Sequence, residues 1–387
     1  MTSTQITKDQ RALRAVAMQF FINGAVTASY IPRLPEIRDH LGVDLTTIGQ
    51  LLTVASVTGL LGSWLSSRVV CQFGTRTTMI YGTIMLIILL PLIAAASSVW
   101  MLLMVLSAIM LVDVLVDVAM NIQGSNLSNR RAMPVMNRLH GLWSVGSVVG
   151  GIIAATMASF LIPLQWHLLG AAALMGVGLI YIGSGLLTSD KAVPIEDGDE
   201  NAAPAPFRAP VSLWVFAILG GTAFVPEMVG SDWSPFRLKD DLETTAGMAG
   251  IGYVAFTVGM VIGRLSGDWV ASKMSKARLL NYAVIIAFCG LSIACLVDFV
   301  PLVYAALTMA GIGISVLFPS LYDAAAQDPR SGAALGAMTA GSRSIVLVAP
   351  LTIGLLADMP ALSVGSAMAI MALPCLVIIG YLYRRIH

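Results

Sequence analysis

The chain has 387 residues, of which 57% are hydrophobic and 11% charged, and its mean hydropathy is +0.85. Soluble domains carry roughly 25% charged residues, so the composition excludes an ordinary soluble globular protein. The formal net charge of +1 gives no basis for a nucleic-acid partner. The four cysteines lie in or beside apolar runs without metal-ligand spacing, so we interpret them as small hydrophobes and expect no metal and no cofactor.

Twelve apolar runs follow one another along the chain, and each approaches or exceeds the roughly 20 residues that a spanning helix needs. The first run lacks a small-residue cleavage site, so we expect a retained helix and not a signal peptide. The predicted fold class is therefore an all-α membrane protein with 12 transmembrane helices. The runs are, approximately, 12–32, 46–67, 77–97, 100–125, 139–162, 165–187, 211–233, 246–268, 278–297, 300–324, 332–356 and 362–383.

The distribution of Lys and Arg orients these runs, because cytoplasmic loops are enriched in positive charge. With both termini in the cytoplasm, sixteen of the 22 Lys and Arg lie on the cytoplasmic side. The opposite side holds only Arg33, Arg38, Arg237 and Lys239. We therefore expect a multi-pass protein of the cytoplasmic (inner) membrane with both termini cytoplasmic.

One longer connection, residues 188–210, is acidic and rich in Pro and Ala, which is typical of a flexible linker. Sequence features also repeat at an offset of about 200 residues. Tyr30-Ile-Pro32 is matched by Trp233-Ser-Pro235, and Gly62–Arg76 is matched by Gly263–Arg278. We predict an N-terminal six-helix half (1–187), a cytoplasmic linker (188–210) and a C-terminal six-helix half (211–387).

The second copy of this repeat resembles the cytoplasmic loop motif of the major facilitator superfamily. The matching residues are Gly263, Arg264, Gly267 and Asp268, followed by basic residues up to Arg278. The resemblance implies the major facilitator fold, and it implies that these four residues form a conformational latch between neighbouring helix ends. In the first copy, Ser66 and Ser67 stand where the motif has an acid.

Longer stretches resemble one branch of that superfamily, the MosC-like (rhizopine transporter-like) group, which is distantly similar to fucose permeases. The stretches are 117–124 (DVAMNIQG), 131–151, 227–238 (EMVGSDWSPFRL), 318–327 (FPSLYDAAAQ) and 350–358 (PLTIGLLAD). The resemblance covers essentially the whole chain. It implies a transporter and leaves the cargo open.

Ionisable groups inside a bilayer are costly and are therefore candidates for function. In the fourth run Asp113, Asp117 and Asn121 share one helical face because they are four residues apart. Two carboxylates one turn apart repel each other, which favours proton exchange. We predict proton coupling at Asp113 and Asp117 and solute binding at Asn121. Hydrogen bonding to neighbouring helices is the alternative role.

The seventh run supplies Glu227, Asp232 and Trp233. We predict that Glu227 couples to protons, and that Asp232 and Trp233 bind a hydroxyl-bearing solute. Alternatively, Trp233 anchors the helix at the interface and Asp232 pairs with Arg237. Tyr30, the repeat partner of Trp233, is a weaker solute-binding candidate.

Asp323 and Arg343 place opposite charges in the tenth and eleventh runs. An isolated buried Arg is costly, so we predict that both contribute to the solute site. Arg343 then binds an anionic group of the cargo, or Asp323 neutralises it to form a gate. A third possibility is that Asp323 lies solvated at the cytoplasmic end of its helix.

Together these patterns predict a secondary active transporter that moves a small polar, sugar- or polyol-like solute by alternating access, most simply by proton-coupled uptake. Proton-antiport efflux of a metabolite or drug is the alternative, since 146–151 resembles an antiporter motif in which Ser147 replaces proline. No constellation typical of an enzyme and no phosphate-binding loop is present in the sequence, so we do not expect an enzyme. The expected partners are the solute, protons and lipid, with the protein acting as a monomer.

Overall fold

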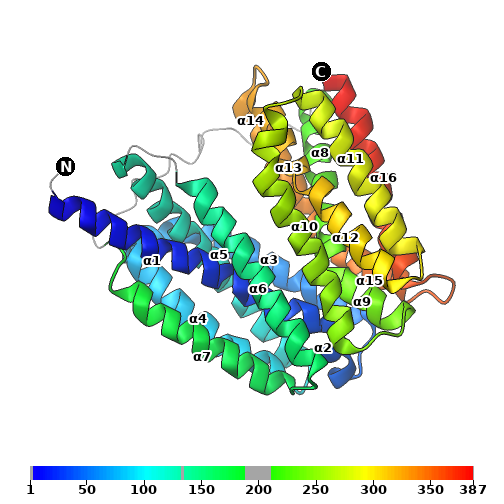
Figure 1. Cartoon of the computed structure of the whole chain (residues 1–387), viewed down its shortest axis with the longest axis horizontal. Coiled ribbons are helices and arrows are strands. Elements are labelled where there is room, and N and C mark those ends of the chain that lie inside the picture. Colours follow the sequence, from blue (N-terminus) through cyan, green and yellow to red (C-terminus); the bar gives the residue numbers. More distant parts are fainter. Residues whose placement is uncertain (1–2, 132–134, 188–210, 387) are drawn as a thin grey trace. The chain divides into compact units, whose positions relative to one another are not determined.

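The computed structural model of the protein describes residues 3–131, 135–187 and 211–386, and every regular element in these ranges is a helix (Figure 1). The predicted linker, 188–210, lies outside the described residues. The elements before it are α1 (Ser3–Ala28), a 3₁₀ turn (Ile31–Arg33), α2 (Leu34–Leu41), α3 (Leu45–Phe73), α4 (Thr75–Ala94), α5 (Val99–Arg131), α6 (Met136–Ser159) and α7 (Leu164–Gly183).

The elements after residue 210 are more interrupted. They are α8 (Val211–Met228), a π-helical turn (Val229–Trp233), α9 (Ser234–Phe236), a second π-helical turn (Arg237–Asp241), α10 (Ala246–Ala271), α11 (Lys276–Leu296), α12 (Val300–Ile314), α13 (Leu317–Ala326), α14 (Ser331–Val346), α15 (Ala349–Ala357) and α16 (Val364–Ile386). Short breaks therefore divide the seventh, tenth and eleventh predicted spans. Interrupted helices are typical of membrane transporters, where the freed backbone groups lie near the solute path.

Within the described ranges, eleven helical segments are long and apolar enough to cross a membrane. They correspond to predicted spans two to twelve. The first predicted span lies in α1, which is helical but more polar. Its Gln19 and Asn23 are buried inside the bundle, at 0% and 3% exposure, and Gln19 Nε2 donates a 2.9 Å hydrogen bond to Thr83 in α4. The polarity of α1 thus serves contacts with neighbouring helices.

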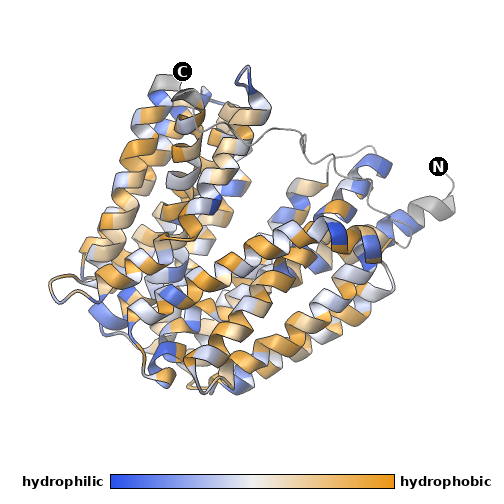
Figure 2. Cartoon of the chain, turned by 180° about the vertical axis from the view of Figure 1, so that it is seen from behind, coloured by the Kyte–Doolittle hydropathy of each residue, from blue (hydrophilic) through white to orange (hydrophobic). Residues whose placement is uncertain are grey.

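Large apolar side chains cover the outer surfaces of the helices. Ile180 on α7 is 79% exposed and Leu265 on α10 is 72% exposed, and Figure 2 shows apolar residues along most of each long helix. Exposed apolar area on this scale is unfavourable in water and fits a hydrocarbon surround. The chain is a multi-pass membrane protein.

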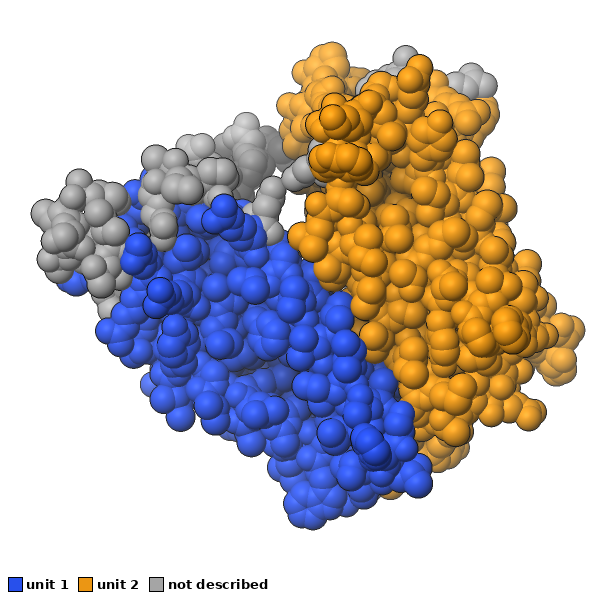
Figure 3. All heavy atoms as spheres, in the orientation of Figure 1, with its two compact units in different colours: residues 1–33, 54–195 blue, residues 34–53, 196–387 orange. Residues whose placement is uncertain are grey.

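The helices form two compact units (Figure 3). Unit 1 contains residues 1–33 and 54–195, and unit 2 contains residues 34–53 and 196–387. The segment 34–53, which holds α2 and the start of α3, therefore packs with the C-terminal helices. Among the described residues, this grouping differs from the predicted halves by that one segment.

The two units repeat one close helix contact. In unit 1, a Cβ on Gly24 of α1 would lie 2.0 Å from Trp143 O, and one on Gly146 of α6 would lie 2.0 Å from Phe21 O. In unit 2, a Cβ on Gly220 of α8 would lie 2.0 Å from a backbone oxygen of α14, and one on Gly341 of α14 would lie 1.8 Å from a backbone oxygen of α8. Small residues allow helix backbones to touch in membranes, so each unit is held by an equivalent glycine-paired crossing.

Candidate functional site

Asp113 and Asp117 lie half-buried on one face of α5 in unit 1. Asn23 Nδ2 on α1 donates a 2.7 Å hydrogen bond to Asp113 Oδ1. Asn121 Nδ2 donates a 3.1 Å hydrogen bond to Asp117 Oδ1. Among the described residues, no Lys or Arg contacts either carboxyl group. Each acid therefore has an amide donor as its partner, and it can exchange a proton without breaking an ion pair.

Asn23 links three helices of unit 1. While its amide nitrogen binds Asp113 on α5, its Oδ1 accepts a 3.0 Å hydrogen bond from Trp143 Nε1 on α6. The two hydrogen bonds, from Trp143 to Asn23 and from Asn23 to Asp113, fix the orientation of the Asp113 carboxyl group. Sequence reasoning missed Asn23 and Trp143, although an amide inside an apolar run was a signal for the first of them.

Tyr30 and Trp233 are the two aromatic residues predicted to contact the solute, and each is buried within its own unit. Tyr30 follows α1 and is 2% exposed, and Trp233 ends the first π turn and has no exposed area. The Trp233 ring packs on Phe236, with centroids 5.5 Å apart, and its Nε1 has no hydrogen-bond partner among the described residues. A solute reaches either ring only after the covering side chains move.

The structure gives Asp232 and Arg237 different partners. Ser231 Oγ donates a 2.7 Å hydrogen bond to Asp232 Oδ1. Arg237 forms ion pairs with Asp241 at 2.9 Å and with Asp298 at 2.5 Å. Asp232 is thus held locally within the π turn.

A partly open cavity of about 270 Å³ in unit 2 brings together two charged residues to which the sequence analysis gives different roles. Glu227 on α8 and Arg264 on α10 form an ion pair with 3.3 Å between Oε1 and Nη2. Their side chains are 32% and 37% exposed. Phe224, Ser315, Phe318 and Ser342 also line the cavity. Arg264 therefore lies beside the predicted proton-coupling Glu227 as well as in the loop motif.

The other latch residues fall into different surroundings. A Cβ on Gly263 would lie 2.1 Å from Ser315 Oγ and 2.6 Å from Ile312 O, so this glycine permits α10 to approach the break between α12 and α13. A Cβ on Gly267 would meet nothing within 4 Å. Asp268 belongs to α10, but its side chain lies outside the described residues.

Asp323 and Arg343 both lie at accessible positions of unit 2. Asp323 on α13 is 48% exposed and pairs with Lys276 Nζ at the start of α11. This position corresponds to the solvated helix-end location considered for Asp323 from the sequence. Arg343 is exposed on α14, one residue after the cavity-lining Ser342.

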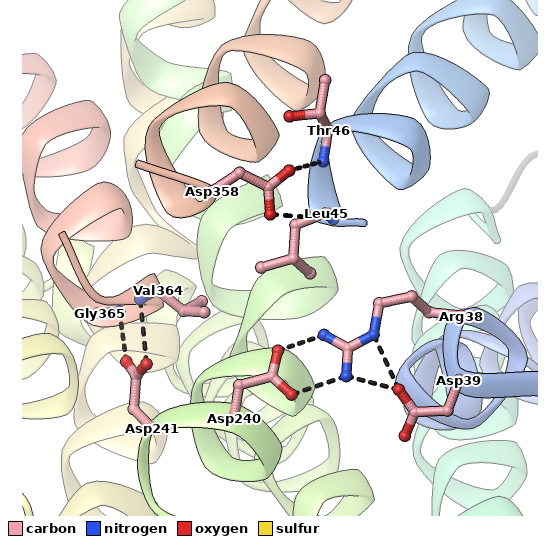
Figure 4. Close-up of polar contacts among 9 residues, drawn as sticks. All are labelled: Arg38, Asp39, Leu45, Thr46, Asp240, Asp241, Asp358, Val364 and Gly365. Atoms are coloured by element: carbon pink, nitrogen blue, oxygen red, sulfur yellow. Dashed lines mark hydrogen bonds and ion pairs between the residues drawn. The ribbon is translucent and has the colours of Figure 1, made fainter. Parts of the chain in front are cut away.

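A second polar cluster, within unit 2, joins the segment 34–53 to the C-terminal helices (Figure 4). Arg38 on α2 binds both oxygens of Asp240, one of them at 2.8 Å from Nη2, and it also contacts Asp39. Burial lowers the pKa of Arg38, but the hydrogen bonds and charges of Asp240 and Asp39 raise it to a net value above the ordinary one. The guanidinium therefore stays charged.

The same cluster caps the N-terminus of α3. Asp358, at the end of α15, accepts hydrogen bonds from the backbone N–H groups of Leu45 (3.2 Å) and Thr46 (2.6 Å), and Asp44 accepts one from Thr47 N at 2.8 Å. These are among the N–H groups that a helix leaves without internal partners, and a carboxylate there also interacts favourably with the helix dipole. We call Arg38, Asp240 and Asp358, with the groups they bind, the docking cluster.

Comparison with known proteins places this architecture in one family. Residues 16–350 match the family model described as Major Facilitator Superfamily. The membrane protein MosC of Rhizobium meliloti is 26% identical over 317 residues, which cover 81% of this chain and 75% of MosC. The predicted resemblance to the MosC-like group is confirmed.

Two solved structures share the fold. The chain superimposes on a variant of the nucleoside transporter NupG with a TM-score of 0.79 at 10% identity, covering 96% of this chain and 98% of that one. It superimposes on a variant of the E. coli fucose:proton symporter FucP with a TM-score of 0.60 at 17% identity, covering 97% of this chain and 98% of that one. The predicted twelve-helix fold class is thereby confirmed. The chain belongs to the Major Facilitator Superfamily and is a membrane-embedded secondary transporter.

Proposed function

We propose that the protein takes up a small polar solute of the sugar or polyol type together with protons. The observation that carries this proposal is the pair Asp113 and Asp117, whose partners among the described residues are the amides of Asn23 and Asn121 and not cations. Proton binding at such a site changes its charge without requiring a salt bridge to break, so it can bias a conformational equilibrium. A fold shared with a fucose:proton symporter and a nucleoside transporter agrees with a hydroxyl-rich cargo.

In this proposal the protein works by alternating access as a monomer in the cytoplasmic membrane. Residues 1–187 and 211–387 form the two moving halves, joined by 188–210, and both termini are cytoplasmic. Asn121, Tyr30, Asp232, Trp233, Asp323 and Arg343 contact the solute in one or more states, Glu227 is a third proton-coupling residue, and Gly263, Arg264, Gly267 and Asp268 form the latch.

The test is uptake into proteoliposomes that hold the full-length protein, with and without an imposed pH gradient. The radiolabelled probes are fucose, galactose, galacturonate, myo-inositol and uridine. We expect inward-directed protons to drive accumulation of at least one probe, and we expect Asp113→Asn or Asp117→Asn to abolish this dependence. Glu243→Gln, which removes an exposed carboxylate from unit 2, is the control. Full pH-gradient dependence in both α5 variants would contradict the proposal.

Efflux remains the second candidate because Gly146, within the antiporter-like stretch, makes the close crossing of α6 with α1. The same vesicles separate the two directions. A preloaded probe that leaves faster when the outside is acidic, together with no gradient-driven accumulation inside, supports antiport.

A further inference from the structure

The cavity of unit 2 has the chemistry of a site for a carboxylate that carries hydroxyl groups. We propose that Arg264 binds the carboxylate of such a solute, a sugar acid or a hydroxy acid, and that Glu227 takes up a proton as the solute displaces it from Arg264. This inference rests on the proposed proton-coupled uptake and narrows its cargo to an anion.

The contact between Glu227 and Arg264 is weak enough for a solute carboxylate to replace Glu227 beside Arg264. It consists of one Nη2–Oε1 contact of 3.3 Å, which is long for a charge-assisted hydrogen bond. The pair of Arg38 and Asp240 in the same unit is bidentate and shorter. A free carboxylate that enters the cavity can take the bidentate geometry that a guanidinium favours. The solute therefore competes with a suboptimal internal partner.

Charge balance connects this exchange to a proton. A guanidinium is charged at physiological pH, and a charged group inside a span requires compensation. Without solute, Glu227 pairs with Arg264. A solute carboxylate beside Arg264 adds one negative charge to the site while Glu227 stays ionised. A proton from the solution that binds a carboxyl oxygen of Glu227 offsets this added charge, so one proton enters with each monoanion.

Other charged groups lie around α8. Asp232 follows Glu227 on the π turn and accepts a 2.7 Å hydrogen bond from Ser231 Oγ. Arg343 lies on α14, which packs along α8, and Asp323 on α13 is paired with Lys276.

The other residues that line the cavity suit the hydroxyl-bearing part of such a solute. Ser315 Oγ donates to Ile312 O at 2.8 Å, and Ser342 Oγ donates to Thr339 O at 2.9 Å. Because both serine protons are used, their oxygens remain as acceptors for solute hydroxyl groups. The rings of Phe224 and Phe318 supply apolar faces. The volume of about 270 Å³ lies just below the roughly 300–1,000 Å³ of ligand pockets, which limits the solute to a small one.

The test compares matched acids and neutral compounds on the purified full-length protein. Thermal unfolding midpoints are measured with galacturonate against galactose and with gluconate against sorbitol, from pH 5.5 to 8. We expect stabilisation by the acid of each pair only, stronger at low pH. Glu227→Gln should bind the acids about tenfold more tightly with little pH dependence, because it removes the competing carboxylate. Arg264→Gln should lose the effect, Arg264→Lys should retain part of it, and Glu243→Gln, at an exposed carboxylate, should match the wild type.

Three results would overturn the inference. They are equal stabilisation by the neutral compound, unchanged acid affinity in Glu227→Gln, and no stabilisation by any probe in either the wild type or Glu227→Gln. The last two do not depend on whether Arg264→Gln folds. Gradient-driven accumulation of galactose or sorbitol alone would refute the anion site and leave proton-coupled uptake standing. Accumulation of the acidic probe that does not depend on the pH gradient would refute proton coupling and leave the anion site standing.

Discussion

Asp358 holds the N-terminus of α3, a helix that begins more than 300 residues earlier in the chain. In Asp358→Asn the side chain keeps one acceptor oxygen and loses its charge. One of the two hydrogen bonds to Leu45 N and Thr46 N can then persist. The substitution therefore weakens this part of the docking cluster without changing the size of the side chain.

The expected cost follows from the geometry. A helix cap contributes about 0.5–2 kcal/mol, and a carboxylate at a helix N-terminus contributes about 0.3–1 kcal/mol through the dipole. With one hydrogen bond and the charge lost, we expect about 1–2 kcal/mol. This corresponds to a factor of about 5–30 in the population of the locally open state.

Hydrogen exchange, resolved to single amides by mass spectrometry, measures this population directly. The amides of Leu45 and Thr46 should exchange about 5–30-fold faster in Asp358→Asn. The matched control is Asp44→Asn, which removes the carboxylate bound to Thr47 N and should accelerate that amide chiefly. If Asp358→Asn changed the exchange of Leu45 and Thr46 by less than about twofold, the assigned cap would be wrong.

Further expectations concern acid stability, helix packing and the α5 network. Hydrogen bonds from the side chain and backbone of Thr47 lower the pKa of Asp44 from 3.8, so its stabilising effect is complete above that pH and lost as the pH falls through the folded-state pKa. The difference in unfolding midpoint between the wild type and Asp44→Asn should therefore shrink below about pH 4. Gly263→Ala should cost about 1–3 kcal/mol in thermal or denaturant unfolding, because its Cβ would meet Ser315 and Ile312. Gly267→Ala, with open space, should be neutral or stabilising by up to about 1 kcal/mol; equal costs at both glycines would contradict this explanation. Asn23→Ala should destabilise unit 1 by about 1–3 kcal/mol in the same assay, since Trp143 Nε1 and Asp113 both lose a partner; an unchanged midpoint would show that this network contributes nothing.

Much of the fold was predictable because a membrane imposes strong rules on sequence. Runs of about 20 apolar residues indicate spans, and spans two to twelve all appear as long apolar segments. The breaks inside spans were harder to predict. The two π turns at 229–241 contain no residue that requires one, and they depend on how this segment packs on α10 and α16.

The candidate site was predictable in its residue types but not in its pairs. The spacing of Asp113, Asp117 and Asn121 correctly placed them on one face of α5. Glu227 and Arg264 were assigned different roles because nothing in the sequence shows that α8 and α10 bring them to 3.3 Å. Asp358 was quoted only as part of a matching stretch, and its contact with α3 spans more than 300 residues. Local patterns specify the face of a helix, while partners across helices depend on tertiary packing.

The π turns of residues 229–241 have a consequence for comparing this chain with its relatives. A π turn holds one residue more than the α-helical turn it replaces. Deletion of one residue here would therefore convert the π turn into an ordinary α-helical turn. The wide turn absorbs its extra residue, so the helix after the deletion would keep its facing. The residue in the place of Asp240 would then stand one position earlier in the chain. An ungapped alignment with a relative that is α-helical here would therefore match Asp240 to a side chain on a different face, and a search for the docking cluster must allow a one-residue gap in this segment.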